Sequence, residues 1–497
     1  MTTAYEELET RFRRHSVLRG AVAVLHWDSA VMMPMGGANA RSDQLAELAL
    51  VCHEILTGAG LAELLDAAEG DAEGLDDWQR ANLVEMRRRW LHANAVPAEL
   101  VRALSEACST CEVVWREARA NDDFAAVRPY LEQVVRLTRE SAEAKSEPLR
   151  CTPYDALLDI HDPGSRAAEV EPIFDELSNF LNGFIGEVVE AQRGEPSAAP
   201  PRGRFPVDAQ RRLGEKLMRH LGFDFGHGRL DTSHHPFTGG VREDQRLTTR
   251  YNEHDFTSGL MAILHETGHA LYEKGLPEKW RHQPVGASRG MSMHESQSLI
   301  VEMQACRSDA FIRCLAGLVR ETFGGEGIEW QADNLIRVYR RVQPGLIRVD
   351  ADEVTYPVHV VMRFHLERAL IAGDLKVADL PDAWREGMRN CLGVQPNDDR
   401  DGCMQDIHWF SGGFGYFPTY TLGAIAAAQL FAAARAADAG VMPGLEKGDF
   451  EPLLSWLRVN VHECGSRYMP REILMRATGR SFDVEGFKTH LRTRYLK

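Results

Sequence analysis

Two histidines separated by three residues are the strongest chemical signal in the chain. His265 and His269 flank Glu266 in the segment LMAILHETGHALYEK, whose apolar residues follow helical spacing. Residues four apart lie on the same face of a helix, so both imidazoles can bind one Zn²⁺ ion. Glu266 lies one position further round, where its carboxylate can reach a water on that ion. The motif therefore predicts a zinc site together with its general base.

A catalytic zinc ion needs a third protein ligand and an open position for water. The extended motif HExxHxxGxxH fails, because Tyr272 and Gly275 occupy its glycine and third-histidine positions. A carboxylate on the next predicted helix is the simplest third ligand. Glu295 lies far enough beyond His269 for a loop and a returning helix, and Glu302, two turns later, competes with it. The same region also offers His282, His294 and Asp309.

The elements that must hold these residues are predicted to be helices. Apolar residues at three- and four-residue spacing predict N-terminal helices at residues 43–56, 76–92, 98–120 and 123–144. They predict further helices at residues 255–274, 293–318, 330–341, 353–372, 381–391 and 419–437. Near-alternation around a Thr-Gly-Gly turn within residues 229–251 predicts one short β-hairpin. Residues 193–206, rich in Pro, Gly and Ser, are predicted to form a surface loop.

Composition excludes some classes of function without indicating a chemistry. Lys and Arg total 57 and Asp and Glu total 73, which gives a formal net charge of −16 and argues against nucleic-acid or acidic-membrane binding. We find no secretory signal, and the low-polarity run 422–434 is too short to cross a bilayer. The nine cysteines are scattered, and Cys108 and Cys111 read as helix packing. We expect a cytoplasmic protein with reduced thiols.

Five further motifs, together with HETGH, resemble those of a known family. They are HPF at residues 235–237, DQRLT at 244–248, HESQ at 294–297, IRVDADEVTY at 347–356 and GCMQDIHW at 402–409. In these motifs and their order, the sequence is similar to the M32 metallocarboxypeptidases, the thermostable carboxypeptidase Taq family, over essentially its whole length. One departure is Leu299, where many members have Arg; it leaves the expected reaction unchanged.

The resemblance implies a zinc-dependent exopeptidase that removes C-terminal residues from peptides. It implies a mainly α, bilobed fold with a deep groove and a small β element, and it implies a homodimer. It selects Glu295 over Glu302 as the third ligand, with one zinc ion per subunit. Co²⁺ and Mn²⁺ are acceptable substitutes for a donor set of two histidines and a glutamate.

The chemistry of peptide hydrolysis assigns further roles. Glu266 is the expected general base, which takes the proton of the attacking water and delivers it to the leaving amine. The oxyanion needs a hydrogen-bond donor, for which His408, Tyr416 and Tyr420 are candidates in the segment HWFSGGFGYFPTYTLG. By resemblance to related helical zinc peptidases, we expect Tyr420 to be the donor and His408 its companion.

An exopeptidase must also recognise the free C-terminal carboxylate of its substrate. The resemblance makes Arg348 the expected anchor, with Arg246 second, because a guanidinium binds a carboxylate through two hydrogen bonds. In the alternative interpretation, Arg348 only pairs with a nearby acid: Asp350, Asp352 or Glu353. Further residues expected to bind substrate or line the groove are His235, Asp244, Thr248, Gln405 and Tyr416. Asp244 and Arg246 could instead form an internal ion pair.

We expect one catalytic unit over residues 1–497, because the candidate site residues run from His235 to Tyr420. It would comprise an N-terminal helical lobe (1–192), the loop 193–206, and a lobe with the zinc site and groove (207–497). Two other functions are considered. One is an endo-acting zinc oligopeptidase on a similar helical scaffold, and the other is a catalytically silent scaffold that binds peptide, which would have no need of Glu266.

Overall fold

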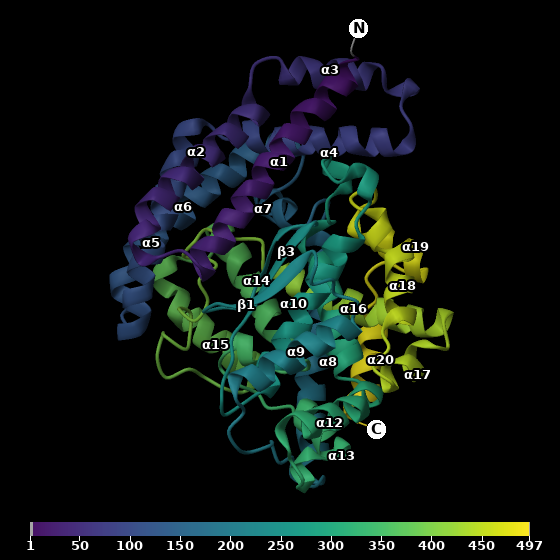
Figure 1. The fold of residues 1–497 in the computed structure, drawn as a ribbon. Helices are drawn as coiled ribbons and strands as arrows, with labels where there is room; N and C mark the ends of the chain where they lie inside the picture. The colour runs from purple at the N-terminus through teal and green to yellow at the C-terminus, as the bar shows by residue number, and fades with distance from the viewer. Residues whose placement is uncertain (1–2, 497) are drawn as a thin grey trace.

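A computed structural model describes residues 3–496, and most of these residues lie in helices (Figure 1). One small sheet accompanies them, so the predicted mainly α fold with a small β element is confirmed.

Eight helices form the N-terminal part of the chain, drawn in purple and blue in Figure 1. They are α1 (Ala4–Val31), α2 (Ala38–Thr57), α3 (Leu61–Gly70), α4 (Asp77–Asn94), α5 (Ala98–Asn121), α6 (Phe124–Leu149), α7 (Pro153–His161) and α8 (Ala167–Arg193). Thr3, Asp76 and Thr152 begin α1, α4 and α7 with reciprocal capping boxes. The periodicity correctly predicted α2, α4, α5 and α6. Residues 194–206 contain no helix or strand, and Asn334 binds their backbone at Ala199.

The sheet has three strands in the order β1 (Gly228–Thr232), β3 (Asp244–Thr249), β2 (Thr238–Val241). β2 and β3 form the predicted antiparallel hairpin, while β1 pairs with β3 in parallel and was not predicted. The predicted turn was wrong. Thr238, Gly239 and Gly240 lie within β2, and the chain reverses at Arg242 and Glu243. Gly240 has a φ of 87°, and a Cβ there would meet the Asp244 carbonyl oxygen, so this paired position requires glycine.

Twelve helices follow in the second part of the chain, as far as the structure describes it. They are α9 (Val207–His220), α10 (Thr257–Gly275), α11 (Gly290–Leu299), α12 (Asp309–Phe323), α13 (Ala332–Tyr339), α14 (Tyr356–Ala372), α15 (Leu380–Leu392), α16 (Pro418–Ala437), α17 (Val441–Glu446), α18 (Glu451–Asn460), α19 (Pro470–Thr478) and α20 (Val484–Tyr495).

The predicted helix at 293–318 is not continuous. It consists of α11, a π-helical segment (Ile300–Cys306) and α12, which begins with Ser308 as its N-cap. A π-helical turn changes the direction in which its side chains project, and such turns are common at functional sites. The sequence did not reveal this, because no Pro or Gly marks the change at Ile300 or the end of the π-helical segment.

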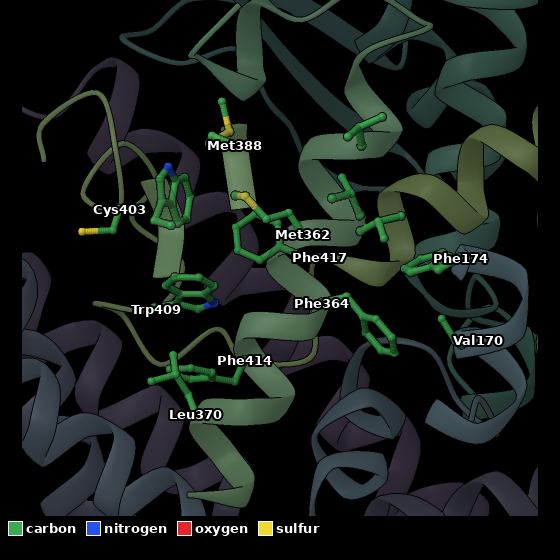
Figure 2. Close-up of a cluster of buried hydrophobic side chains, with 14 of the residues drawn as sticks. Val170, Phe174, Met362, Phe364, Leu370, Met388, Cys403, Trp409, Phe414 and Phe417 are labelled. Atoms are coloured by element: carbon green, nitrogen blue, oxygen red, sulfur yellow. The ribbon is translucent and has the colours of Figure 1, made fainter. Parts of the chain in front are cut away.

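Two large hydrophobic cores share helix α16. The first joins α5 to α8 with α14, α15, α16 and α20, and Figure 2 shows part of it around α14. The second lies among α9 to α13 and α16 to α19, and it includes Leu299. α16 gives Leu422 and Ile425 to the first core and Ala426 and Leu430 to the second. A helix that is apolar on all sides is suited to this central position.

The CxxC pair in the N-terminal part of the chain is not a disulfide. Cys108 and Cys111 lie in α5 with free thiols, and burial raises the pKa of each, to about 11 and about 12, as expected for packing residues. Within residues 3–496, no single helix is long and apolar enough to span a membrane. Met35–Thr57 and Leu61–Gly70, bent by 45°, satisfy the length and composition test only as a pair.

Glycines allow α11 to lie unusually close to both of its neighbours. On α10, a Cβ at Gly268 would lie 2.6 Å from the Gln297 carbonyl oxygen and 2.7 Å from Ser298 Cα. On α16, a Cβ at Gly423 would lie 2.8 Å from Glu295 Cβ. Real Cβ atoms do not approach other atoms so closely, so these glycines set the positions of the helices that hold the candidate ligands.

Gly268→Ala is expected to force α10 and α11 apart and to lower the free energy of unfolding by about 1–3 kcal/mol, as overpacking does. Chemical denaturation and measurement of bound metal would check this, since both should fall. Gly317→Ala is the control, because Gly317 lies in α12 and a Cβ there would meet nothing within 4 Å. It should raise stability by about 0.5–1 kcal/mol. Equal effects of the two substitutions would contradict the packing argument.

Candidate metal centre and active site

His265, His269 and Glu295 form one compact cluster of potential metal ligands. One ligand atom from each residue lies within 4.8 Å of the others. Glu295 Oε2 is 3.9 Å from His265 Nε2 and 3.6 Å from His269 Nε2. α10 supplies both histidines and α11 supplies the glutamate, as the HExxH spacing and a returning helix predict. Two imidazoles and one carboxylate are a donor set that suits a catalytic zinc ion and leaves a position open for water.

In both His265 and His269, the Nδ1 atom, which faces away from Glu295, has a hydrogen-bond acceptor in the protein. His265 Nδ1 donates to Glu302 Oε2 at 2.9 Å, and Arg307 Nη2 donates to the other oxygen of Glu302 at 2.5 Å. Glu302, the competing candidate for third ligand, thus lies behind His265, where the π-helical segment directs it. A carboxylate in this place fixes the tautomer that presents Nε2 to a metal and increases the basicity of the ligand.

His269 is oriented through His294. His269 Nδ1 lies 3.1 Å from the His294 carbonyl oxygen and 2.7 Å from His294 Nδ1. His294 Nε2 in turn donates to Glu273 Oε1 at 2.9 Å. Both candidate histidine ligands therefore present Nε2 towards Glu295.

Electrostatics act in opposite directions on the two histidines, because burial and the charges of His294 and His265 lower the pKa of His269 well below its ordinary value. Burial opposes the charged form of His265, but the carboxylates of Glu295 and Glu302 outweigh it and raise the pKa of His265 to about 10. Burial, together with the negative charge of Glu302, raises the pKa of Glu295 above its ordinary value. A divalent cation would relieve both effects, because it satisfies the carboxylates and needs no proton on the imidazole.

Glu266 lies beside the cluster and is held by the sheet. Thr238 Oγ1, in β2, is 2.7 Å from Glu266 Oε2 and 2.9 Å from the Glu266 carbonyl oxygen. Burial, with the nearby Glu295 carboxylate, raises the pKa of Glu266. A buried carboxylate whose pKa is raised and whose orientation is fixed is a better proton acceptor than an ordinary carboxylate.

The candidate oxyanion donors form a cluster of aromatic side chains at the start of α16. The hydroxyl oxygen of Tyr420, in α16, lies 3.3 Å from His408 Nε2. The ring centroids of Tyr420 and Tyr416 are 5.2 Å apart. Burial, with the charge of Glu295, raises the pKa of both tyrosines, so they stay protonated. Burial, with the charges of Arg348 and Arg363, lowers the pKa of His408 to about 4, so it is neutral. The site thus contains neutral hydrogen-bond donors close to the third ligand.

Arg348 is buried in an ion-pair cluster next to these tyrosines. Its Nε and Nη2 donate to Asp406 Oδ1 at 3.2 Å and 2.8 Å, and its Nη1 donates to Tyr356 OH at 2.8 Å. Arg363 binds the second oxygen of Asp406, with Nε at 2.8 Å.

Arg348 thus pairs with an acid, as the alternative interpretation expected, but that acid is Asp406. It forms no ion pair with Asp350, Asp352 or Glu353, the three acids that the alternative offered, all of which the structure describes. Asp352 accepts from the backbone N–H groups of Val354 and Thr355, just before α14, and Glu353 pairs with Arg494 and His490.

Comparison with known proteins identifies the chain. A family model described as carboxypeptidase Taq (M32) metallopeptidase matches residues 7–495. The chain belongs to the M32 metallocarboxypeptidase family. Thermostable carboxypeptidase 1 of Thermus thermophilus is 39% identical, over 99% of this chain and 98% of that protein. Carboxypeptidase 1 of Bacillus subtilis is 32% identical, again over 99% and 98% of the two chains.

Solved structures agree with this family. Trypanosoma cruzi metallocarboxypeptidase 1 matches with a TM-score of 0.97 and 39% identity, covering 99% of each chain. The M32 carboxypeptidase from Deinococcus radiodurans R1 matches with a TM-score of 0.93 and 36% identity, covering 99% of this chain and 98% of that one. The resemblance seen in the motifs is confirmed. The protein is a metallocarboxypeptidase, an enzyme that uses a metal cofactor and acts on peptides.

Several residues expected to line the groove make internal contacts in this M32 enzyme. Asp244 and Arg246 form a two-point ion pair at 2.9 Å and 2.7 Å, and the Arg246 guanidinium lies 4.3 Å from the Trp27 ring centroid. Thr248 is buried and its hydroxyl accepts from the Phe237 N–H at 3.0 Å, which fixes the HPF turn. His235 in that turn is exposed.

Gln405 also has internal partners for its whole side chain. Its Oε1 accepts from the Arg348 backbone N–H and from Arg363, and its Nε2 donates to two carbonyl groups. The amide therefore holds the Arg348 segment in place. Among the other ligand candidates, His282 contacts Arg281 and Asp309 pairs with Arg340, both outside the His-His-Glu cluster.

Sequence reasoning missed four contributors to the M32 site. Thr238 orients Glu266, Glu273 supports His294, and Arg363 with Asp406 holds Arg348. Glu273 had a usable signal, because it lies four residues after His269 and so on the same face of α10. The others gave no local signal, since their partners are distant in sequence.

Replacement of the two glutamates should separate their roles. Glu302→Gln is expected to weaken metal affinity by about 10–100-fold, the usual effect of losing the partner of a histidine ligand, with activity restored by excess metal. Glu295→Gln should lose activity that excess metal does not restore. Metal titration against a chelator, followed by activity at saturating metal, measures both. The reverse pattern would make Glu302 the ligand.

Proposed function

We propose that the enzyme is a zinc carboxypeptidase whose metal is held by His265, His269 and Glu295, with Glu266 as general base. The observation that carries this proposal is the convergence of the three ligand atoms, with Glu266 fixed beside them by Thr238. When bound, the metal would lower the pKa of a water molecule and polarise the scissile carbonyl group.

The protein groups supply the remaining steps. Glu266 accepts the proton of the attacking water and transfers it to the leaving amine. Tyr420 donates a hydrogen bond to the developing oxyanion, and His408 orients the Tyr420 hydroxyl. The raised pKa of Tyr420 supports this role, because only a protonated phenol can donate.

Arg348 is proposed to bind the C-terminal carboxylate of the substrate. A guanidinium has five N–H groups, and the contacts with Asp406 and Tyr356 engage Nε and one N–H on each terminal nitrogen, within the residues described. One N–H on each terminal nitrogen is left for a substrate. The charge of Arg348 also acts on Glu295, which supports a position near the reaction centre.

An endo-acting oligopeptidase and a silent peptide-binding scaffold are not favoured, because the relatives across the full chain are named carboxypeptidases. One catalytic unit over the whole chain is our proposal, supported by the helix α16 shared between the two main cores. The homodimer and the cytoplasmic location stay predictions.

Mass spectrometry of one peptide digested over time tests the reaction. The wild type should give a ladder of products shortened from the C-terminus, which a chelator abolishes and added Zn²⁺ restores. Glu266→Gln should bind the metal normally but lose about 10²–10⁴-fold in turnover, the usual contribution of a general base. Internal cleavage would favour the endo-acting alternative, and retained turnover in Glu266→Gln would exclude that residue as the base.

A pair of peptides that differ only at the C-terminus tests the anchor. The wild type should hydrolyse the free acid much faster than the amide, since only the acid offers a charge to Arg348. In Arg348→Ala, this preference should fall by about 10–100-fold, mainly through slower hydrolysis of the acid. Arg246→Ala is the control, because its guanidinium is held by Asp244 outside the Arg348 cluster. If Arg246→Ala alone erased the preference, the anchor would be Arg246.

A further inference from the structure

Glu367 is a fully buried carboxylate in α14 on which three donors converge. Tyr154 OH donates to its Oε2 at 2.8 Å, the Gly415 N–H donates to the same oxygen at 3.1 Å, and Trp409 Nε1 donates to Oε1 at 2.8 Å. Tyr154 belongs to α7, while Trp409 and Gly415 flank the glycine-containing loop that precedes α16. A buried carboxylate is costly unless its oxygens accept hydrogen bonds, and these three donors meet that need. We call Glu367 and its three donors, Tyr154, Trp409 and Gly415, the junction.

The loop at Gly415 lies directly against α7. A Cβ at Gly415 would lie 2.8 Å from the Leu157 carbonyl carbon and 2.8 Å from the Leu158 nitrogen, and its φ is 82°. The backbone is thus held by α7 on one side and by Glu367 on the other, with the Phe414 and Trp409 rings in the core shown in Figure 2.

Tyr416 is the next residue, and its position depends on this junction. Its ring centroid lies 5.0 Å from that of His161 and 5.6 Å from that of His408. Its ring centroid also lies 5.2 Å from that of Tyr420, on the helix α16 that contacts Glu295 at Gly423. Since one peptide unit separates Tyr416 from the hydrogen-bonded N–H of Gly415, a shift of that N–H moves the Tyr416 hydroxyl as well.

We propose that Glu367 is a positioning residue that fixes the Tyr416 hydroxyl beside the metal centre. This rests on the proposed function and on the substrate-binding role expected from the sequence for Tyr416. The choice of residue supports the proposal, because a carboxylate can accept from all three donors. A glutamine would turn its NH₂ group towards at least one of them.

The ionised form of Glu367 is unfavourable in this buried position. Burial raises the pKa of this carboxyl to about 7, against the effects of Trp409, Tyr154, Gly415 and the charge of Arg363. Because the pKa is higher in the folded protein than in the unfolded chain, the ionised group costs stability as the pH rises towards 7.

A double-mutant cycle tests the proposal on the whole enzyme. Glu367→Gln and Tyr416→Phe should each lower kcat/KM for a free-acid peptide by about tenfold or more, with unchanged metal content. The double variant should be no worse than the more damaged single variant, because Glu367 acts through the hydroxyl that Tyr416→Phe removes. Multiplied effects would overturn the proposal, and so would full activity of either single variant.

A matched control separates positioning from general destabilisation. Asn334 is another buried polar side chain, and it holds a loop by two hydrogen bonds with the backbone of Ala199. Neither residue belongs to the junction. Asn334→Ala should combine with Tyr416→Phe multiplicatively. Non-multiplicative behaviour with this control as well would overturn the specific role of Glu367.

Hydrogen exchange gives a readout that does not need activity. In Glu367→Gln, amides of residues 412–417 should exchange faster, while those of α10 should be unchanged. Unchanged exchange in the loop would overturn the proposal even if activity fell. A wild type that produces no C-terminal ladder would instead contradict the proposed function. The exchange result would still show whether Glu367 fixes the loop at residues 412–417.

Discussion

The close approach of three helices around Glu295 is the constraint on which the site depends. α11 lies against α10 at Gly268 and against α16 at Gly423, and neither contact has room for a methyl group. Because packed interiors deform little, the distance between the histidines and the glutamate is set by backbone contact rather than by side-chain flexibility. The glycine of HETGH therefore has a structural role that the zinc motif alone does not express.

Around this rigid centre, each reacting group is held by a partner from another part of the chain. Glu302 and His294 hold the histidines, Thr238 holds Glu266, and Asp406 holds Arg348. These partners come from a π-helical segment, a helix, a strand and a loop. Preorganisation of this kind lowers the cost of orienting groups during the reaction, and it explains why the small sheet is retained beside a helical site.

The sequence was informative wherever chemistry or periodicity is local. HExxH placed both histidines and Glu266 on one helix, and the apolar spacing located helices such as α5, α10 and α14. It failed where geometry depends on distant contacts. The strand β1 pairs in parallel with β3 across a long connection, and no Pro or Gly marks the change to a π-helix at Ile300. Choosing Glu295 over Glu302 required the family resemblance, because both lie on one predicted helix.

The cluster of Arg348, Arg363 and Asp406 contains two positive charges and one negative charge in a largely buried place. Unbalanced charge is unfavourable away from water, so such a group is left one anion short of neutrality. An arriving carboxylate would be the fourth member of this group and would complete its balance. In a protein of net charge −16, this small excess of positive charge would attract an anionic chain end locally, whereas the overall charge of the molecule would repel it.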